Sequence, residues 1–263
     1  MNILVCVKQV PDVSQVEIDR ETNNLKRDGV KSIVNPSDLN ALQAALEIKR
    51  VTEGKVTVIS MGPPQADEAI KECLAIGADD GYVICDQAFI GSDTLATSYV
   101  LSQAAKKLGD FDLVFTGTNS IDGDTGQVGP ELAELLGINQ ATYVKSLEIN
   151  EENRSVSVTR DLEFMEEKAY VQLPALFSII RDSNFVNSPS RKKLIQLKKE
   201  EIKILTAKDL DCDENRIGMK GSATVVSEVY PPEEVEKGQF VEGSVDEQVD
   251  KVIEILANHE LIK

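Results

Sequence analysis

Two hydrophobic periods alternate along the first 140 residues. Short runs that are apolar almost throughout, and rich in β-branched residues, are typical of strands buried on both faces of a parallel sheet. These runs occupy residues 3–7, 55–60, 81–85 and 112–117. Between them, apolar residues recur at intervals of three and four, which favours helices. The predicted helices span residues 37–50, 64–78 and 92–109.

This alternation predicts an α/β fold with a mostly parallel, doubly wound sheet and helices on both faces. After residue 140 the pattern changes. Residues 141–149 and 155–164 alternate between apolar and polar and flank the turn-forming "NEENR", so they predict a β-hairpin added to the sheet. The apolar "LPALFSII" (173–180) predicts a further buried strand.

The C-terminal part of the chain predicts an extended arm that ends in a helix. Residues 187–205 are rich in lysine, and the chain is polar from about residue 212 until residue 244. We therefore expect an α/β domain over 1–205 and an arm with a helix over 206–263. The helix could pack on this domain or on a partner chain, and the sequence leaves both open. Its apolar stripe consists of Val245, Val249, Val252, Ile253 and Leu256.

Charge and cysteine usage narrow the class of protein. Lys and Arg number 28 and Asp and Glu 45, so the net charge of −17 argues against nucleic acid or an anionic membrane as a partner. The four cysteines form no CxxC pair, which is typical of a reduced protein of the cytoplasm. The first apolar run is too short for a signal peptide, and none approaches the roughly 18 residues of a membrane span.

A glycine-rich segment at residues 117–137 is the main candidate for ligand binding. Its glycine spacing fits neither a Walker A loop nor a dinucleotide fingerprint. An EF-hand is excluded because Gln127 and Ala133 stand where its glycine and its bidentate glutamate are required. What remains is a strand ending at Gly117, a tight loop and a helix beginning near Gly126. Free N–H groups at such a helix start favour a phosphate.

Asp122 and Asp124 lie in the same loop, where their charges would repel a phosphate. We therefore expect these two carboxylates to point aside, to bind ribose hydroxyls, to cap the helix or to contact a partner. The alternative is that both are solvated turn residues.

Three other loops are expected at the same edge, because the carboxyl ends of parallel strands form the ligand site of open sheets. Thr94 and Thr97 lie one turn apart at a helix start and could hold a diphosphate, although such hydroxyls commonly serve only as caps. Met61 follows a strand, and Asn35 could hydrogen-bond an adenine edge. Together the four loops predict a nucleotide.

No catalytic constellation is present in the sequence. The only histidine, His259, is distant from any Cys or Asp cluster, and there is no GxSxG or HExxH motif. We therefore expect no catalytic side chain, and any redox chemistry falls to a cofactor. A nucleotide sensor or hydrolase on the same type of sheet is a second interpretation, against which the missing Walker lysine counts.

Six motifs together resemble the beta subunit of an electron transfer flavoprotein. They are "CVKQVPD" (6–12), "NPSD" (35–38), "SMGPPQA" (60–66), "GADDG" (77–81), "GSDTLATS" (91–98) and "SIDGDTGQVGP" (120–130). The resemblance runs to about residue 185 and more loosely beyond. It implies a nucleotide-binding domain that pairs with an alpha subunit carrying its own FAD.

The resemblance leaves two cofactors to choose from. Ordinary members of the family hold a structural AMP in this subunit, and electron-bifurcating members hold a second FAD that NADH reduces. The paired Thr94 and Thr97 and the loop "DGDTGQVGP" (122–130) are similar to the bifurcating type, so we expect FAD. The expected cofactor site comprises Cys6, Lys8, Asn35, Asp38, Met61, Thr94, Thr97, Gly117, Asp122, Gly123, Asp124, Thr125, Gly126, Gln127 and Val128.

The implied function is electron transfer. Electrons from NADH would be split between a low-potential acceptor such as ferredoxin and the alpha-subunit FAD, which feeds a flavin dehydrogenase. The alternative is a subunit with AMP that docks an acyl-CoA dehydrogenase. The basic residues 189–199 resemble in position the loop that docks such dehydrogenases, or they form a solvated helix.

Overall fold

The computed structural model describes residues 1–12, 17–18, 25–26, 31–227, 238, 240–259 and 261–262. The chain divides into two compact units, Met1–Val226 and Ser227–Lys263. Each is considered by itself below.

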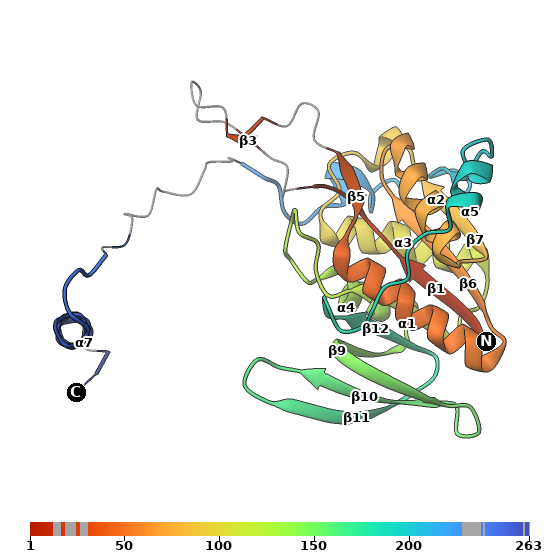
Figure 1. Ribbon diagram of the computed structural model, residues 1–263. Helices are drawn as coiled ribbons and strands as arrows, with labels where there is room; N and C mark the ends of the chain where they lie inside the picture. The colour runs from red at the N-terminus through yellow and green to blue at the C-terminus, as the bar shows by residue number, and fades with distance from the viewer. Residues whose placement is uncertain are drawn as a thin grey trace. The chain divides into compact units, whose positions relative to one another are not determined.

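The first unit is built on a nine-stranded sheet (Figure 1). Every pair of neighbouring strands is parallel except those made by β10, which is antiparallel to both of its neighbours. The strand order is β11 (Glu166–Gln172), β10 (Ser155–Asp161), β9 (Asn139–Asn150), β12 (Ala175–Ile179), β8 (Leu113–Gly117), β1 (Asn2–Cys6), β6 (Lys55–Met61), β7 (Asp80–Ile84) and β13 (Lys203–Leu205).

The first unit also contains several short strands and helices outside the main sheet. Two small antiparallel pairs are β2 (Gln9–Pro11) with β5 (Ser32–Val34), and β3 (Glu17–Ile18) with β4 (Leu25–Lys26). The remaining short helices are η2 (Pro64–Ala66), η3 (Gln87–Phe89), α5 (Arg191–Leu197) and α6 (Gly218–Gly221).

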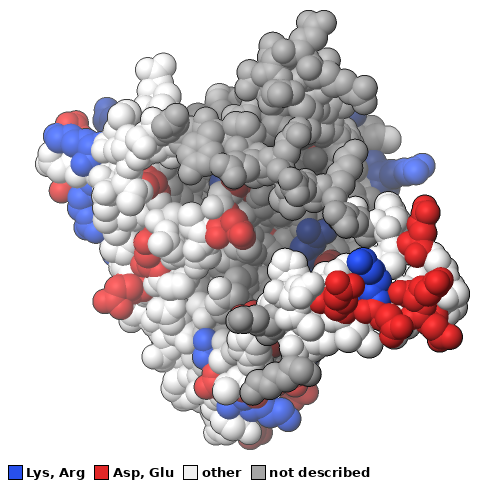
Figure 2. All heavy atoms as spheres, turned by 90° about the vertical axis from the view of Figure 1, so that its left-hand side faces the viewer, with Lys and Arg blue, Asp and Glu red and all other residues white. Residues whose placement is uncertain are grey.

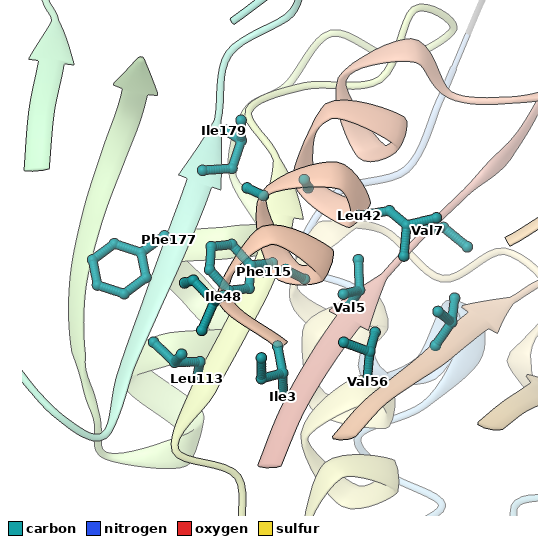
Figure 3. Packing of buried hydrophobic residues seen from close by; sticks show 14 of the residues in the cluster. Ile3, Val5, Val7, Leu42, Ile48, Val56, Leu113, Phe115, Phe177 and Ile179 are labelled. Carbon is teal, nitrogen blue, oxygen red and sulfur yellow. The ribbon is translucent and has the colours of Figure 1, made fainter. Parts of the chain in front are cut away.

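Helices cover both faces of the sheet, because alternate side chains of a strand point to opposite faces. On one face, Val5 of β1 and Phe115 of β8 pack in the same apolar cluster as Leu42 of α1 (Pro36–Thr52) (Figure 3). The helix α2 (Asp67–Ile76) belongs to the same layer.

On the other face, Leu4 packs with Val100 of α3 (Thr94–Leu108) and Leu132 of α4 (Val128–Leu136). The predicted doubly wound α/β fold is confirmed, and the four strands and three helices predicted before residue 140 all form.

The antiparallel extension is larger than predicted. The predicted hairpin forms as β9 and β10, and the strand predicted at 173–180 forms as β12 between β9 and β8. A third strand, β11, pairs with β10 along its whole length. It escaped prediction because its sequence, "EEKAYVQ", is polar on one face and has only Ala169 and Val171 to pack on the other. The short edge strand β13 within the lysine-rich stretch was also missed.

The boundary expected at residue 205 lies too early, because the first unit continues to Val226. Leu210 and Ile217 are buried in the apolar cluster beneath α3. The Asp93 carboxylate, at the N-cap of α3, accepts hydrogen bonds from the N–H groups of Ala223 and Thr224 at 2.8 and 2.9 Å. Residues 206–226 therefore belong to the α/β unit.

The second unit contains α7 (Val245–Asn258), which confirms the predicted terminal helix. The helix starts with a capping box in which Ser244 and Glu247 satisfy each other's backbone N–H groups. No α7 residue is buried, and the side chains of Val249, Val252 and Ile253 are 45–50% exposed. Among the described residues of the second unit, these three side chains of the apolar stripe therefore have no cover.

Candidate functional site

The ends of β1, β6 and β8 lie at the same edge of the sheet, because the three strands are parallel and adjacent. This edge leads into the loop residues that the sequence singled out. Residues 117–130, called the glycine loop below, connect β8 to the start of α4.

The Asp38 carboxylate joins three of these elements. It lies in the first turn of α1 and is only 7% exposed. One oxygen accepts the N–H of Lys8 after β1 at 2.8 Å, and the other accepts the N–H of Gly117 at the end of β8 at 3.0 Å. A Cβ on residue 117 would lie 2.3 Å from this carboxylate, so only glycine lets the strand approach so closely.

Burial raises the pKa of the Asp38 carboxyl from its ordinary 3.8 to about 7. The N–H groups of Lys8 and Gly117 oppose this shift because they stabilise the ionised form. Burial likewise raises the pKa of the Cys6 thiol, and the Asp38 charge adds to it. Cys6 packs in the apolar cluster with Leu4, so its thiol is a core group rather than an exposed nucleophile.

Asn35 fastens the glycine loop to α1. Its amide nitrogen donates to the Ser37 Oγ and to the carbonyl of Asn119, both at 2.9 Å. Its amide oxygen accepts the N–H of Ile121 at 3.1 Å. The side chain is 1% exposed. Its polar groups are therefore engaged by the loop, and these contacts do not support the expected bond to an adenine edge.

The two aspartates of the loop are turned to other side chains. Lys8 Nζ lies 2.8 Å from the Asp122 carboxylate, and the Asn119 amide donates to Asp124. Partial burial favours the neutral form of Asp122, but the hydrogen bonds from Lys8 and Ser120 outweigh it and lower the pKa. The expectation that both carboxylates point aside thus has a structural basis, with Lys8 balancing one of the charges.

The start of α3 lies against the start of α4. The Thr94 hydroxyl is 3.1 Å from Gln127 Oε1 and 3.3 Å from Glu131 Oε1. The Ser98 hydroxyl, one turn further along α3, is 3.0 Å from the other oxygen of Glu131. The structure therefore brings Thr94 to the glycine loop, as the sequence predicted.

Two further predicted hydroxyls lie in the same region. Thr97 is half-buried on α3, and Thr125 is exposed in the glycine loop. Within the described residues neither hydroxyl has a hydrogen-bond partner. Both can serve as donors to a ligand.

The first turn of α4 presents backbone donors at this edge. Its first backbone bond runs from the N–H of Glu131 to the carbonyl of Gln127 at 3.1 Å. The N–H groups of Val128 and Gly129 precede that bond and are among those that a helix start leaves for a cap or a ligand. A helix start of this kind attracts an anion.

Buried hydroxyls at the same edge have no partner. In the described part of the chain, Thr116 and Thr118 are such cases at the end of β8. Thr116 is 5% exposed and lies beneath α4, since a Cβ on Gly129 would be 2.8 Å from its Oγ1. A buried hydroxyl without a partner is costly. The N–H groups of α4 can donate to an anion at this edge, whereas the hydroxyls of Thr116 and Thr118 are enclosed by the protein.

The other predicted residues lie in the glycine loop or at the elements next to it. Gly126 has φ +64°, a conformation that favours glycine, and Gly123 is exposed. Val128 begins α4 and is partly buried. Met61 ends β6 and packs against the cluster beneath α3.

Sequence reasoning missed Thr116 and Asn119 at this edge. A threonine near the end of the apolar run 112–117 was a readable signal, since a polar residue there faces the ligand edge of a parallel sheet. Asn119 gave no such signal because its place depends on the folded loop.

The rest of the described surface gives less information about a ligand. A cavity of about 720 Å³ lies elsewhere in the first unit, lined by Asp86, Ala88, Ala207, Lys208, Asp211, Cys212, Glu214 and Ile217 to Lys220. Acidic and basic groups are interspersed over the described surface shown in Figure 2. The described residues contain no metal-binding group of three His, Cys, Asp or Glu, and their helices are all too short or too polar to cross a membrane.

Comparison with known proteins decides the family. The profile described as "Electron transfer flavoprotein domain" matches residues 22–210. The chain is 46% identical over its whole length to the electron transfer flavoprotein subunit beta of Thermoanaerobacterium thermosaccharolyticum, whose whole length is also covered. The chain belongs to the electron transfer flavoprotein family, as a beta subunit.

Two other relatives carry different names. The beta subunit is 40% identical to the caffeyl-CoA reductase-Etf complex subunit CarD of Acetobacterium woodii, with 95% of each chain covered. It is 39% identical to the protein FixA of Azorhizobium caulinodans, over 96% of this chain and 92% of the relative.

Asp38 makes the stability of the beta subunit depend on pH. Its pKa is raised on folding, so between about pH 5 and pH 7 the folded state binds more protons than the unfolded state, and stability falls as pH rises. Relative to Asp38→Asn, the wild-type free energy of unfolding should fall by about 2 kcal/mol over this range, at roughly 1.4 kcal/mol per pH unit until Asp38 begins to ionise near pH 7. Urea denaturation at several pH values measures it.

The exposed Asp110→Asn variant controls for the loss of one carboxylate. The free energy of unfolding of this variant should differ from that of wild type by the same amount at pH 5 and at pH 7. If the free energies of unfolding of wild type and Asp38→Asn differ by the same amount at every pH, the raised pKa of Asp38 is wrong.

Proposed function

We propose that this beta subunit holds FAD at the glycine loop, where the flavin supplies the redox chemistry by accepting hydride from NADH and releasing the electrons singly. One electron would go to a low-potential acceptor of the ferredoxin type, and the other to the FAD of an alpha subunit that feeds a flavin dehydrogenase. The observation that carries the proposal is the meeting of the starts of α3 and α4, where the hydroxyls of Thr97 and Thr125 have no partner within the described chain.

The chain's own groups would bind and orient the nucleotide. The N–H groups of Val128 and Gly129 and the hydroxyls of Thr97 and Thr125 would donate to its phosphates. Such donors are already fixed in place by the fold, so little reorganisation is needed on binding. Asp93 caps the start of α3, so the donors on α3 are hydroxyls. The N–H groups at the start of α4 together with the Thr97 hydroxyl would offer donors for two phosphates, which favours FAD over AMP.

Lys8 has an electrostatic part in the same proposal. It is paired with Asp122, so the loop presents less net negative charge to an anionic ligand than its sequence suggests. At a few ångströms an unpaired carboxylate would repel a phosphate appreciably.

The partners are proposed from exposed apolar surface and from the relatives. The uncovered stripe of α7 would be buried by the alpha subunit, since an amphipathic helix needs an apolar surface to cover it. The exposed Ile195 of α5, within the basic stretch 189–199, would contact a dehydrogenase. The name of the Acetobacterium woodii relative, a subunit of a CoA reductase complex, is consistent with such a partner. We place the assembly in the cytoplasm.

The cofactor content tests the proposal. The beta subunit, purified together with its alpha subunit, should contain two flavins per heterodimer after extraction. Addition of NADH without oxygen should bleach the visible flavin absorbance. One flavin and one AMP per heterodimer, with no bleaching by NADH, would show instead a subunit that holds a structural AMP.

A double-mutant cycle tests the role of the Lys8–Asp122 pair. Lys8→Met should weaken FAD binding by roughly tenfold, because Asp122 is left as an unbalanced charge beside the phosphates. Asp122→Asn alone should bind FAD at least as tightly as wild type. Isothermal titration of the nucleotide-stripped heterodimer gives the affinities.

The double variant shows whether Lys8 acts by neutralising Asp122 or by contacting the ligand itself. In a Lys8→Met and Asp122→Asn double variant most of the lost affinity should return, since the repelling charge is gone. If the double variant binds as weakly as Lys8→Met, Lys8 acts on the ligand directly and the pairing argument is wrong.

A further inference from the structure

Tyr143 has an unusual backbone conformation near the candidate site. It lies in β9 with φ +56°, in the left-handed region that bulky residues rarely adopt. The pairing register with β12 shifts at Tyr143, between Phe177 and Ile179, and the register with β10 shifts two residues further along β9, between Thr159 and Arg160 of β10. Such a bulge re-aims the side chain that it carries.

The surroundings hold this bulge from both sides. The N–H of Tyr143 donates to the Ser178 Oγ at 3.3 Å. Arg160 donates through Nε to the carbonyl of Thr142 at 2.8 Å, and through Nη1 to Glu167 at 2.6 Å. Strain that is fixed in this way by its neighbours is common at ligand sites.

The bulge directs the phenol toward the glycine loop. Its oxygen lies 4.0 Å from the position that a Cβ on Gly126 would take. Gly126 precedes the first turn of α4, beneath which the Thr116 hydroxyl is buried without a partner in the described chain. The ring is 48% exposed, and within the described residues the phenol oxygen has no hydrogen-bond partner.

We propose that Tyr143 is a nucleotide-binding residue whose phenol donates a hydrogen bond to a phosphate held at the start of α4. This inference rests on the proposed function, because it assigns a further contact to the same site. The phenol is a neutral donor in a loop that already carries Asp122 and Asp124, so it adds a bond to the anion without adding negative charge. A hydrogen bond to a charged acceptor is the stronger kind.

Removal of the phenol oxygen alone tests this assignment. In the nucleotide-stripped heterodimer, Tyr143→Phe should bind both FAD and AMP about tenfold more weakly than wild type. Its affinity for adenosine, which has no phosphate, should be unchanged. Isothermal titration with the three ligands measures the affinities. Tyr170→Phe, on the exposed side of β11, is the matched control and should bind all three ligands as wild type does.

Three results would overturn the proposal. Wild-type affinity of Tyr143→Phe for FAD and AMP would show that the phenol does not bind the nucleotide. An equal loss for adenosine would place the phenol on the base or ribose and not on a phosphate. Failure of the wild-type heterodimer to bind any of the three would sink the proposed function first. A thermal unfolding midpoint of nucleotide-free Tyr143→Phe equal to that of wild type, which we expect, shows that weaker binding is not loss of fold.

Discussion

One buried carboxylate holds the functional edge of this beta subunit together. Asp38 accepts the N–H groups that follow β1 and end β8, and it does so from the first turn of α1. A charge in this position is unfavourable by burial and is tolerated because two N–H groups face it. The same contact fixes where the glycine loop leaves the sheet, so the positions of Lys8 and of the α4 helix start depend on it.

Local pairing would reconcile the acidic loop with the anionic ligand that we propose. Asp122 is matched by Lys8, and Asp124 by the Asn119 amide, while backbone N–H groups and hydroxyls supply the donors. The net charge of the chain therefore says little about the charge at this edge. What a ligand meets is set by which acidic groups already have partners, and this is a property of the folded loop.

The sequence predicted the fold and the meeting of several loops at one edge of the sheet, for definite physical reasons. Buried parallel strands and their helices have strong periodicities, so the convergence of Thr94 and residues 117–130 could be foreseen. The burial of Asp38, the paired amide of Asn35 and the bulge at Tyr143 could not, because each depends on contacts across the sheet. The strand β11 and the extension of the first unit to Val226 were missed because their patterns are mostly polar.

Hydrogen exchange on the heterodimer tests the location of the nucleotide most directly. FAD added to the nucleotide-stripped complex should slow exchange at the amides of residues 126–129 and of the first turn of α3. The amides of residues 207–220, which line the separate cavity, should be unaffected. Protection confined to residues 207–220, with the glycine loop unchanged, would contradict the assignment of the nucleotide site to the strand ends.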